Sequence, residues 1–128
     1  MKENPIVFTS RDETLRVKPS AIVYFEADGN YAHITTVNCM RASVCMNLDG
    51  VERHIAAYFP EESAKFTRVG KQLVVNNDYV LQVSVLKQKL VLSDGKTFSF
   101  TLDASKEALR KLQKTIVIDN GLKKDDEE

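Results

Sequence analysis

The sequence is poor in the residues from which metal sites and active sites are made. It has no tryptophan, two histidines and two cysteines among 128 residues. So few histidines and cysteines leave little from which a metal cluster or a nucleophilic site could be built. No G-x-S-x-G, P-loop or H-E-x-x-H spacing occurs either. We therefore predict a protein that is not an enzyme, with no catalytic residues, no metal and no cofactor.

Long hydrophobic runs are also missing. Apolar runs are only a few residues long, whereas a membrane helix needs roughly 20 apolar residues in a row. The first residues, MKENPIVF, place Glu3 and Pro5 where a secretion signal would be apolar. We expect no membrane segment, no export and a cytoplasmic location.

The positions of the histidines and cysteines in the sequence do not indicate a catalytic site or a metal site. His33 falls within an expected strand and His54 at the edge of an expected helix, and we favour structural or surface roles for both over a catalytic one. In the cytoplasm Cys39 and Cys45 should remain reduced thiols. They are six residues apart, so an unbroken strand would place them on one face. We expect them to pack as small apolar groups, because their spacing matches no zinc motif.

The sequence also has no overall excess of positive or negative charge. The 18 basic residues balance 18 acidic ones, and the surplus is only local: residues 119–128 carry a net charge of −3 and residues 104–114 a net charge of +3. A duplex-binding protein usually has a clearer basic footprint. The basic segment has two open interpretations, a phosphate-contacting patch or a solvated helix face whose bases suit the C-terminal end of the helix dipole.

The length fits one domain. We expect residues 1–118 to fold around a single core and residues 119–128 to form a charged, disordered tail. Short segments of β-branched and alternating residues, separated by turn signals, predict a mostly β fold. Besides the hairpin described next, strands are expected at Ile6–Thr9, Leu15–Lys18, Met40–Met46, Phe66–Val69, Leu73–Val75, Tyr79–Leu86, Lys89–Leu92 and Thr97–Thr101.

The clearest strand–turn–strand pattern runs from Ile22 to Thr36. Its turn is Asp28-Gly29-Asn30, because glycine and asparagine tolerate positive φ. With the following Tyr31, the turn has two open interpretations. It is either a hairpin turn before a core tyrosine or a loop that presents an amide and a phenol to a partner.

Two amphipathic helices are expected. The first spans about residues 48–59, between an Asn47 N-cap and Pro60. The second spans about residues 104–115 and has Asp103 as its N-cap. The residues expected on their apolar faces are Leu48, Val51, Ile55 and Tyr58 in the first helix and Ala108, Leu109 and Leu112 in the second.

Four blocks of sequence, in order over about residues 15–115, resemble the LytTR (LytR/AlgR-type) DNA-binding domain family. The blocks are Ile22–Ala27 with Gly29–Tyr31, then Leu48, Val51 and Phe66-x-Arg68-Val69, then Val74–Asn76 with Val80, and finally Leu90–Lys96. The resemblance implies an elongated arrangement of small antiparallel sheets. Members are bacterial transcription regulators, usually behind a receiver domain, and the present sequence would be a freestanding member or an excised fragment.

The resemblance also implies where DNA would bind. Family members place loops at sheet edges into successive major grooves and bend the duplex. The matching candidate residues for DNA contact are Asn30 and Tyr31 in the first loop, Arg68, Lys71 and Gln72 in the second, and Thr101 after the last strand. Lys106 and Arg110 would contact phosphates. The expected partners are double-stranded DNA with promoter repeats and a second copy of the domain.

Several contact positions depart from the family pattern. Gly70 replaces a histidine, Lys71 replaces an arginine and lacks its bidentate fork, and Leu102 replaces a second arginine with the acidic Asp103 beside it. An arginine–guanine pair contributes about 1–3 kcal/mol of base discrimination. The alternative function is therefore a LytTR-like scaffold that has lost specific DNA binding and acts as a protein-interaction or regulatory module, with a sensor or regulator protein as its partner.

Overall fold

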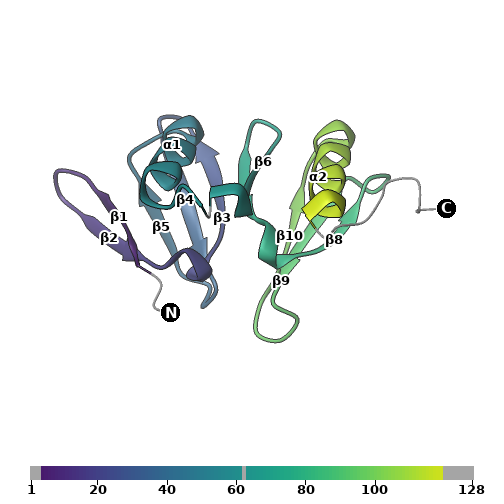
Figure 1. The fold of residues 1–128 in the computed structure, drawn as a ribbon, viewed down its shortest axis with the longest axis horizontal. Helices are drawn as coiled ribbons and strands as arrows, with labels where there is room; N and C mark the ends of the chain where they lie inside the picture. Colours follow the sequence, from purple (N-terminus) through teal and green to yellow (C-terminus); the bar gives the residue numbers. More distant parts are fainter. Residues whose placement is uncertain (1–3, 62, 120–128) are drawn as a thin grey trace.

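The computed structural model describes residues 4–61 and 63–119 (Figure 1). The fold is mostly β, as the sequence predicts, and consists of three antiparallel sheets and two helices. The strands are β1 (Ile6–Thr9), β2 (Thr14–Val17), β3 (Ile22–Asp28), β4 (Tyr31–Thr36), β5 (Arg41–Val44), β6 (Phe66–Val69), β7 (Leu73–Asn76), β8 (Val80–Ser84), β9 (Lys89–Ser93) and β10 (Ser99–Asp103), and the helices are α1 (Leu48–Tyr58) and α2 (Lys106–Asp119).

The central sheet has five strands in the order β5-β4-β3-β7-β6. The inner strands β3 and β7 are covered on both faces, which explains their unbroken hydrophobic runs, IVYF and LVV. A register shift between Ile22 and Tyr24 interrupts the alternation of β3. Because of this bulge, Val23 and Tyr24 both point to the same side of the sheet, while Ile22 and Phe25 point to the other.

The first core lies between one face of this sheet, helix α1 and the β1–β2 hairpin. Helix α1 begins at the expected cap, where the Asn47 side chain accepts a hydrogen bond from Gly50 N at 2.9 Å. Its buried face holds Leu48, Val51 and Ile55. The expectation of Tyr58 on this face is wrong, because 42% of Tyr58 is exposed; its ring packs against that of His54.

His54 ties α1 to the β1–β2 hairpin. Its Nε2 lies 2.6 Å from the Val7 carbonyl oxygen, to which it donates a hydrogen bond. Its ring also packs against Phe8, with 4.8 Å between the centroids. His54 is thus a structural residue of the first core.

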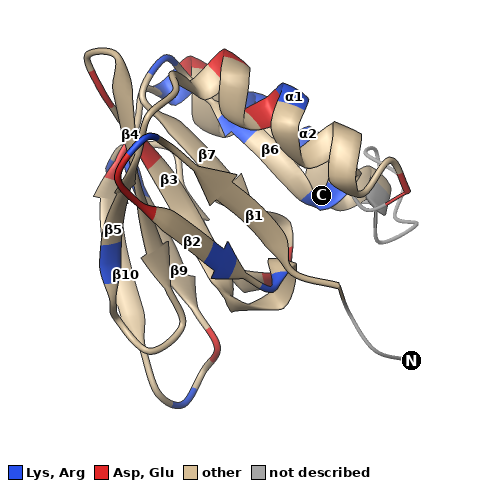
Figure 2. Ribbon diagram, turned by 90° about the vertical axis from the view of Figure 1, so that its left-hand side faces the viewer, with Lys and Arg blue, Asp and Glu red and all other residues tan. Residues whose placement is uncertain are grey.

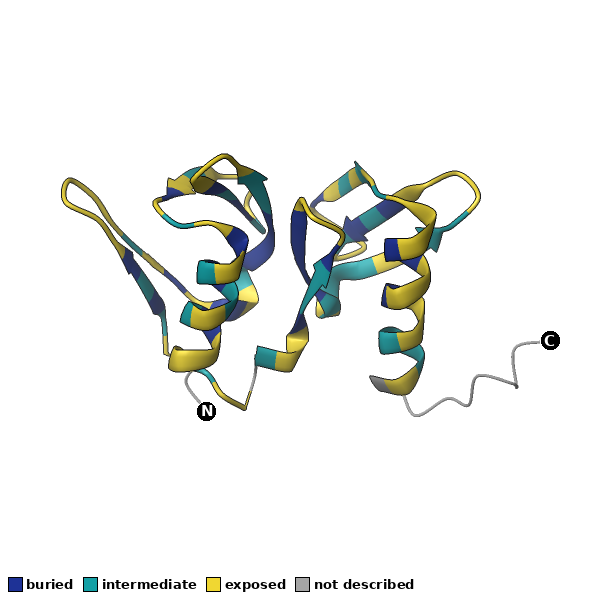
Figure 3. Ribbon diagram, turned by 90° about the horizontal axis from the view of Figure 1, so that it is seen from above, coloured by how far each residue is buried: buried dark blue, intermediate teal, exposed yellow. Residues whose placement is uncertain are grey.

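The expectation of a single core is wrong, because a second core lies on the opposite face of the central sheet. It is closed by the three-stranded sheet β10-β9-β8 and by the apolar side of α2, which buries Ala108, Leu109 and Leu112 as expected. Figure 3 shows the buried positions concentrated in the strands and on the inner sides of the helices, whose outer sides are exposed. The molecule is elongated because one core lies on each side of the central sheet (Figure 1).

The second helix differs from the expectation of residues 104–115. It runs from Lys106 to Asp119, and Ser105 caps it by accepting a hydrogen bond from Ala108 N at 3.1 Å. Asp103 is the last residue of β10 instead, where its carboxylate pairs with Lys89 on the neighbouring strand. A cross-strand partner thus keeps Asp103 in the sheet and moves the helix start two residues along the chain. The expected disordered tail lies outside the described residues, apart from Asp119 at the end of α2.

The expected packing of the cysteines is wrong. Cys39 and Cys45 are both exposed, and β5 spans Arg41–Val44 rather than Met40–Met46. Cys39 lies in the turn before β5 with φ of +65°, and this turn is closed by a hydrogen bond from Thr36 N to Met40 O. The tight turn breaks the strand that would have placed the two thiols on one face. In the described part of the chain, no helix is long and apolar enough to cross a membrane.

Candidate nucleic-acid interface

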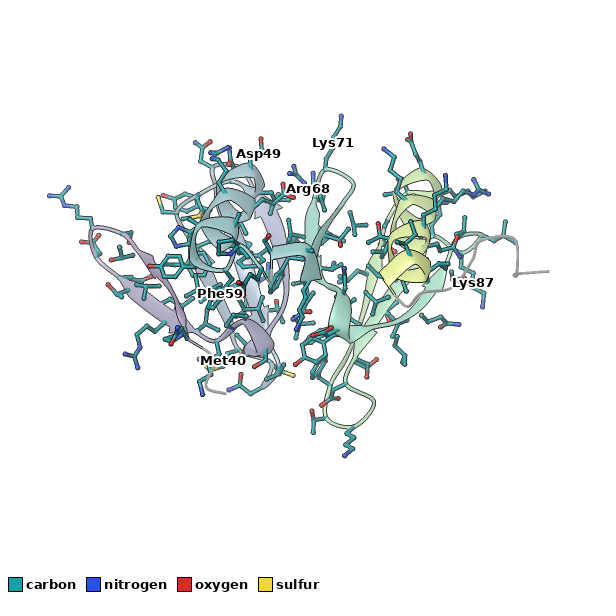
Figure 4. The ribbon with its side chains drawn as sticks, in the orientation of Figure 1. Met40, Asp49, Phe59, Arg68, Lys71 and Lys87 are labelled. Carbon is teal, nitrogen blue, oxygen red and sulfur yellow. The ribbon has the colours of Figure 1, made fainter. Side chains whose placement is uncertain are left out.

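Three chain segments that carry candidate contact residues reach the same long edge of the molecule, the upper edge in Figure 1. They are the β3–β4 turn, the β6–β7 turn and the link from β10 into α2. Helix α1 begins at this edge too, and Figure 4 shows Asp49 of α1 and Lys71 of the β6–β7 turn there. We call this side of the molecule the loop edge.

The β3–β4 turn contains the first two candidates. Gly29 has φ of +62°, a conformation that glycine adopts without strain, so the hairpin closes with two residues between paired Asp28 and Tyr31. Asn30 and Tyr31 are exposed, and Tyr31 presents 51% of its surface. Of the two interpretations of this turn, the core tyrosine is therefore wrong, and the amide and the phenol both face solvent.

Below this turn, His33 joins neighbouring strands. Its Nε2 lies 2.7 Å from Asp28 Oδ2, and its Nδ1 lies 3.0 Å from Ser43 Oγ. His33 is paired across the sheet with Ser43 on β5. The hydrogen-bond chain Asp28–His33–Ser43 therefore fastens the β3–β4 turn to the edge strand of the central sheet.

The β6–β7 turn is built around Gly70, which has φ of +65°. A Cβ at this position would lie 3.6 Å from the Cβ of Ala108 on α2. The family histidine would be strained at such a φ, so Gly70 suits the shape of this turn. Lys71 and Gln72 are exposed, and Figure 4 shows Lys71 extending away from the body of the protein.

The first two turns are joined directly. Ala27 N donates a hydrogen bond of 2.8 Å to the carbonyl oxygen of Gln72. This bond continues the β3–β7 ladder by one residue beyond Glu26 and Leu73. The side chains of Asn30, Tyr31, Lys71 and Gln72 are thus carried by neighbouring turns with a shared backbone connection.

Arg68 is oriented inward, toward α1. Its Nη1 lies 2.8 Å from Asp49 Oδ1 and 2.9 Å from Glu52 Oε1. The hydrogen bond from Asp49 raises the pKa of Arg68, and the same bond lowers the pKa of Asp49. Arg68 is therefore already engaged by two carboxylates and joins β6 to the first turn of α1.

A groove separates the β6–β7 turn from the start of α2. Its lining residues are Arg68, Val69, Gly70, Lys71, Gln72, Leu73, Asp103, Ala104, Ser105, Glu107, Ala108 and Lys111. Lys71 and Lys111 bring positive charge to it from opposite sides. The sequence had indicated Lys106 and Arg110 on α2, and it is the unselected Lys111 that lines the groove.

Only part of the third segment, the link from β10 into α2, lies beside the two turns. Thr101 is exposed on β10, but it does not line the groove. Leu102, at the family arginine position, faces the second core. Asp103 lines the groove with its carboxylate paired to Lys89, which compensates its charge. Lys106 and Arg110 are exposed on α2, outside the groove lining.

The chemistry available at the loop edge is that of recognition. It offers amide, phenol, hydroxyl and ammonium groups, and both signs of charge occur along it (Figure 2). Among residues 4–61 and 63–119, no group of three or more histidine, cysteine or acidic side chains could hold a metal ion. Exposed hydrogen-bonding side chains on fixed turns suit the reading of base edges.

Comparisons with known proteins agree with this architecture. The model of the LytTr DNA-binding domain family matches residues 12–116. Among solved structures, the fold is similar to the LytTr DNA-binding domain of a protein described as a methyl-accepting/DNA response regulator from Bacillus cereus. That similarity has a TM-score of 0.60 and 14% sequence identity, and it covers 90% of this chain and 98% of that one. No curated protein sequence matches.

The family match extends over most of the chain and includes every strand from β3 to β10 as well as α1. The family is a non-catalytic one. The chain therefore belongs to the LytTR DNA-binding domain family.

Proposed function

We propose that this domain binds double-stranded DNA as a transcription regulator through its loop edge. Asn30 and Tyr31 would contact one part of the major groove, and Lys71 and Gln72 the adjoining part. The observation that supports this most directly is the 2.8 Å hydrogen bond between Ala27 N and Gln72 O, because it holds the two turns side by side. A regulator of this kind meets DNA in the cytoplasm.

The remaining candidates have supporting roles in this proposal. Lys106 and Arg110 on the exposed side of α2 contact backbone phosphates, together with Lys111 in the groove, and Thr101 adds a hydroxyl. Arg68 supports the β6–β7 turn and does not contact DNA directly in this proposal. Its two ion pairs with α1 hold β6, and a phosphate would have to compete with both carboxylates. Two copies bind the two halves of a repeated promoter site.

A titration of the full chain against the DNA upstream of its own gene tests the proposal. Fluorescence anisotropy at about 50 mM and about 200 mM salt should show binding that weakens with salt, with a preference over unrelated duplex DNA. Lys71→Ala should weaken binding by about 1–3 kcal/mol if Lys71 reads guanine. Gln72→Ala should reduce the discrimination between the two duplexes more than it reduces affinity for unrelated DNA.

Lys87→Ala is the matched control. Lys87 is an exposed lysine in the β8–β9 turn, near one end of the molecule and away from Lys71 (Figure 4). Its removal should leave both affinity and discrimination unchanged. Equal effects of Lys71→Ala and Lys87→Ala would show that the loop edge has no special part in binding.

A second candidate function is a protein-interaction module with a sensor or regulator protein as its partner. It is favoured by the engagement of Arg68 with Asp49 and Glu52, which leaves the loop edge with mixed charge. Absence of DNA binding even at the lower salt concentration would support this candidate and overturn the first.

A further inference from the structure

We propose that the Asp28–His33–Ser43 hydrogen-bond chain makes DNA binding proton-linked, so that the domain holds duplex DNA more tightly when His33 is protonated. The inference rests on the proposed function, because it assumes that the β3–β4 turn faces DNA. It adds a regulatory property, dependence on pH, to the same edge.

The geometry places a titratable ring directly beneath the turn. Ala32 and Ile34 point into the first core, so His33 between them points to the opposite face of the sheet. There its Nε2 is 2.7 Å from Asp28 Oδ2 and its Nδ1 is 3.0 Å from Ser43 Oγ. The His33 side chain is 22% exposed and that of Asp28 is 66% exposed. Solvent therefore reaches this pair.

The other charged groups around His33 compensate each other. Glu26 is paired with His33 across the β3–β4 ladder, and its Oε1 lies 3.4 Å from Arg41 Nη2 on β5. Tyr31 on the same strand contributes a phenol, and Cys45 just after β5 contributes a thiol. Of these side-chain types, imidazole is the one that proteins use as a charge switch near neutral pH.

The sign of the effect follows from the charge that each state brings to the phosphates. With a neutral imidazole, Asp28 presents one uncompensated negative charge at the turn, which DNA repels. Protonation of His33 cancels that charge across the 2.7 Å contact. Because DNA then favours the protonated state, binding takes up a proton, and the affinity falls as the pH rises.

The experiment measures the dissociation constant of the full chain for its upstream DNA at about pH 6.0 and about pH 7.5, at constant salt. The wild-type affinity should be about three- to tenfold higher at the lower pH, the change expected for one charge near a phosphate. His33→Gln should remove most of this difference, and its affinity should resemble the wild type at the higher pH. Asp28→Asn should raise the affinity at the higher pH and flatten the profile.

His54→Gln is the matched control, because His54 is the other histidine of the chain and donates to Val7 O in the first core. This variant should keep the pH dependence of the wild type, and circular dichroism would verify that each variant is folded. An undiminished pH dependence in His33→Gln would overturn the inference. Salt-dependent, sequence-preferring binding with a flat wild-type profile would overturn it too, while leaving the proposed function intact. Absence of binding at both pH values would overturn both.

Discussion

Asn76 shows how one buried polar side chain can fix the position of several segments. Only 2% of this residue is exposed, and its Nδ2 donates to Ile22 O at 2.9 Å and to Pro19 O at 3.4 Å. Its Oδ1 accepts a hydrogen bond of 3.0 Å from Asp78 N. The single amide therefore joins the end of β7 to the start of β3 and to the turn that leads into β8.

Replacement of Asn76 by alanine should lower the free energy of unfolding by about 2–3 kcal/mol, because two buried backbone carbonyls lose their donor. Urea denaturation of the variant and the wild type measures the change. Gln113→Ala removes an exposed amide on α2 and serves as the control, with little expected effect. A loss for Asn76→Ala as small as that of the control would contradict this account of Asn76.

Single residues differ in how far the sequence could predict their structural roles. Asn76 belongs to a block that resembles the family, yet nothing in the sequence states that its amide reaches the backbone of β3. Cys39 has no such pattern around it. Its left-handed backbone, with φ of +65°, depends on a turn closed between Thr36 and Met40. A non-glycine residue in that conformation cannot be foreseen from composition or alternation.

Among the turns, the one between β9 and β10 illustrates how one carboxylate can order a whole loop. Asp94 Oδ1 accepts hydrogen bonds from the backbone amides of Lys96, Thr97 and Phe98 at 2.9, 2.7 and 3.2 Å. Asp94 Oδ2 accepts one from the Thr97 hydroxyl. The hydroxyl first, and then the amides, lower the pKa of Asp94 far below its usual value.

This depressed pKa links the hairpin to pH. Because the ionised carboxylate is favoured in the folded state, its stabilisation is fully present above the ordinary aspartate pKa of about 3.9 and is lost progressively below it. The stability difference between the wild type and Asp94→Asn should therefore shrink as the pH falls from about 5 to about 2. Urea denaturation at each pH measures the difference. A constant difference over this range would show that the charge of Asp94 does not order the turn.

Helix boundaries show why the candidate site could be predicted only in part. Asp103 and Ser105 are both good N-cap residues, and the choice between them is made by Lys89 on a neighbouring strand. The apolar face of α2 was predicted correctly from its spacing. Which polar side of the helix meets the β6–β7 turn depends on tertiary packing, and so Lys111 was missed. The two turns themselves were predicted, because turn residues and family resemblance agreed there.

At the scale of the whole molecule, β3 and β7 connect the two cores. Phe25 and Val74 face the first core, and Val23 and Val75 face the second. The same strands end in the two turns that form the middle of the loop edge. A change in either core is therefore transmitted to strands that belong to both, and the spacing of the β3–β4 and β6–β7 turns depends on the intact sheet.

The two cores should accordingly unfold as one cooperative unit. Ile55→Ala creates a cavity in the first core and Leu109→Ala in the second, and each should cost about 2–5 kcal/mol. In each variant, the free energy of opening measured at the amides of α1 and of α2 should fall by a similar amount. The reason is that β3 and β7 belong to both cores, so that neither core stays folded without the other. Hydrogen exchange of α1 and α2, measured in both variants, tests this. Faster exchange of α2 in Leu109→Ala with unchanged protection of α1 would mean that the second core opens alone, and that the loop edge can separate at the β6–β7 turn.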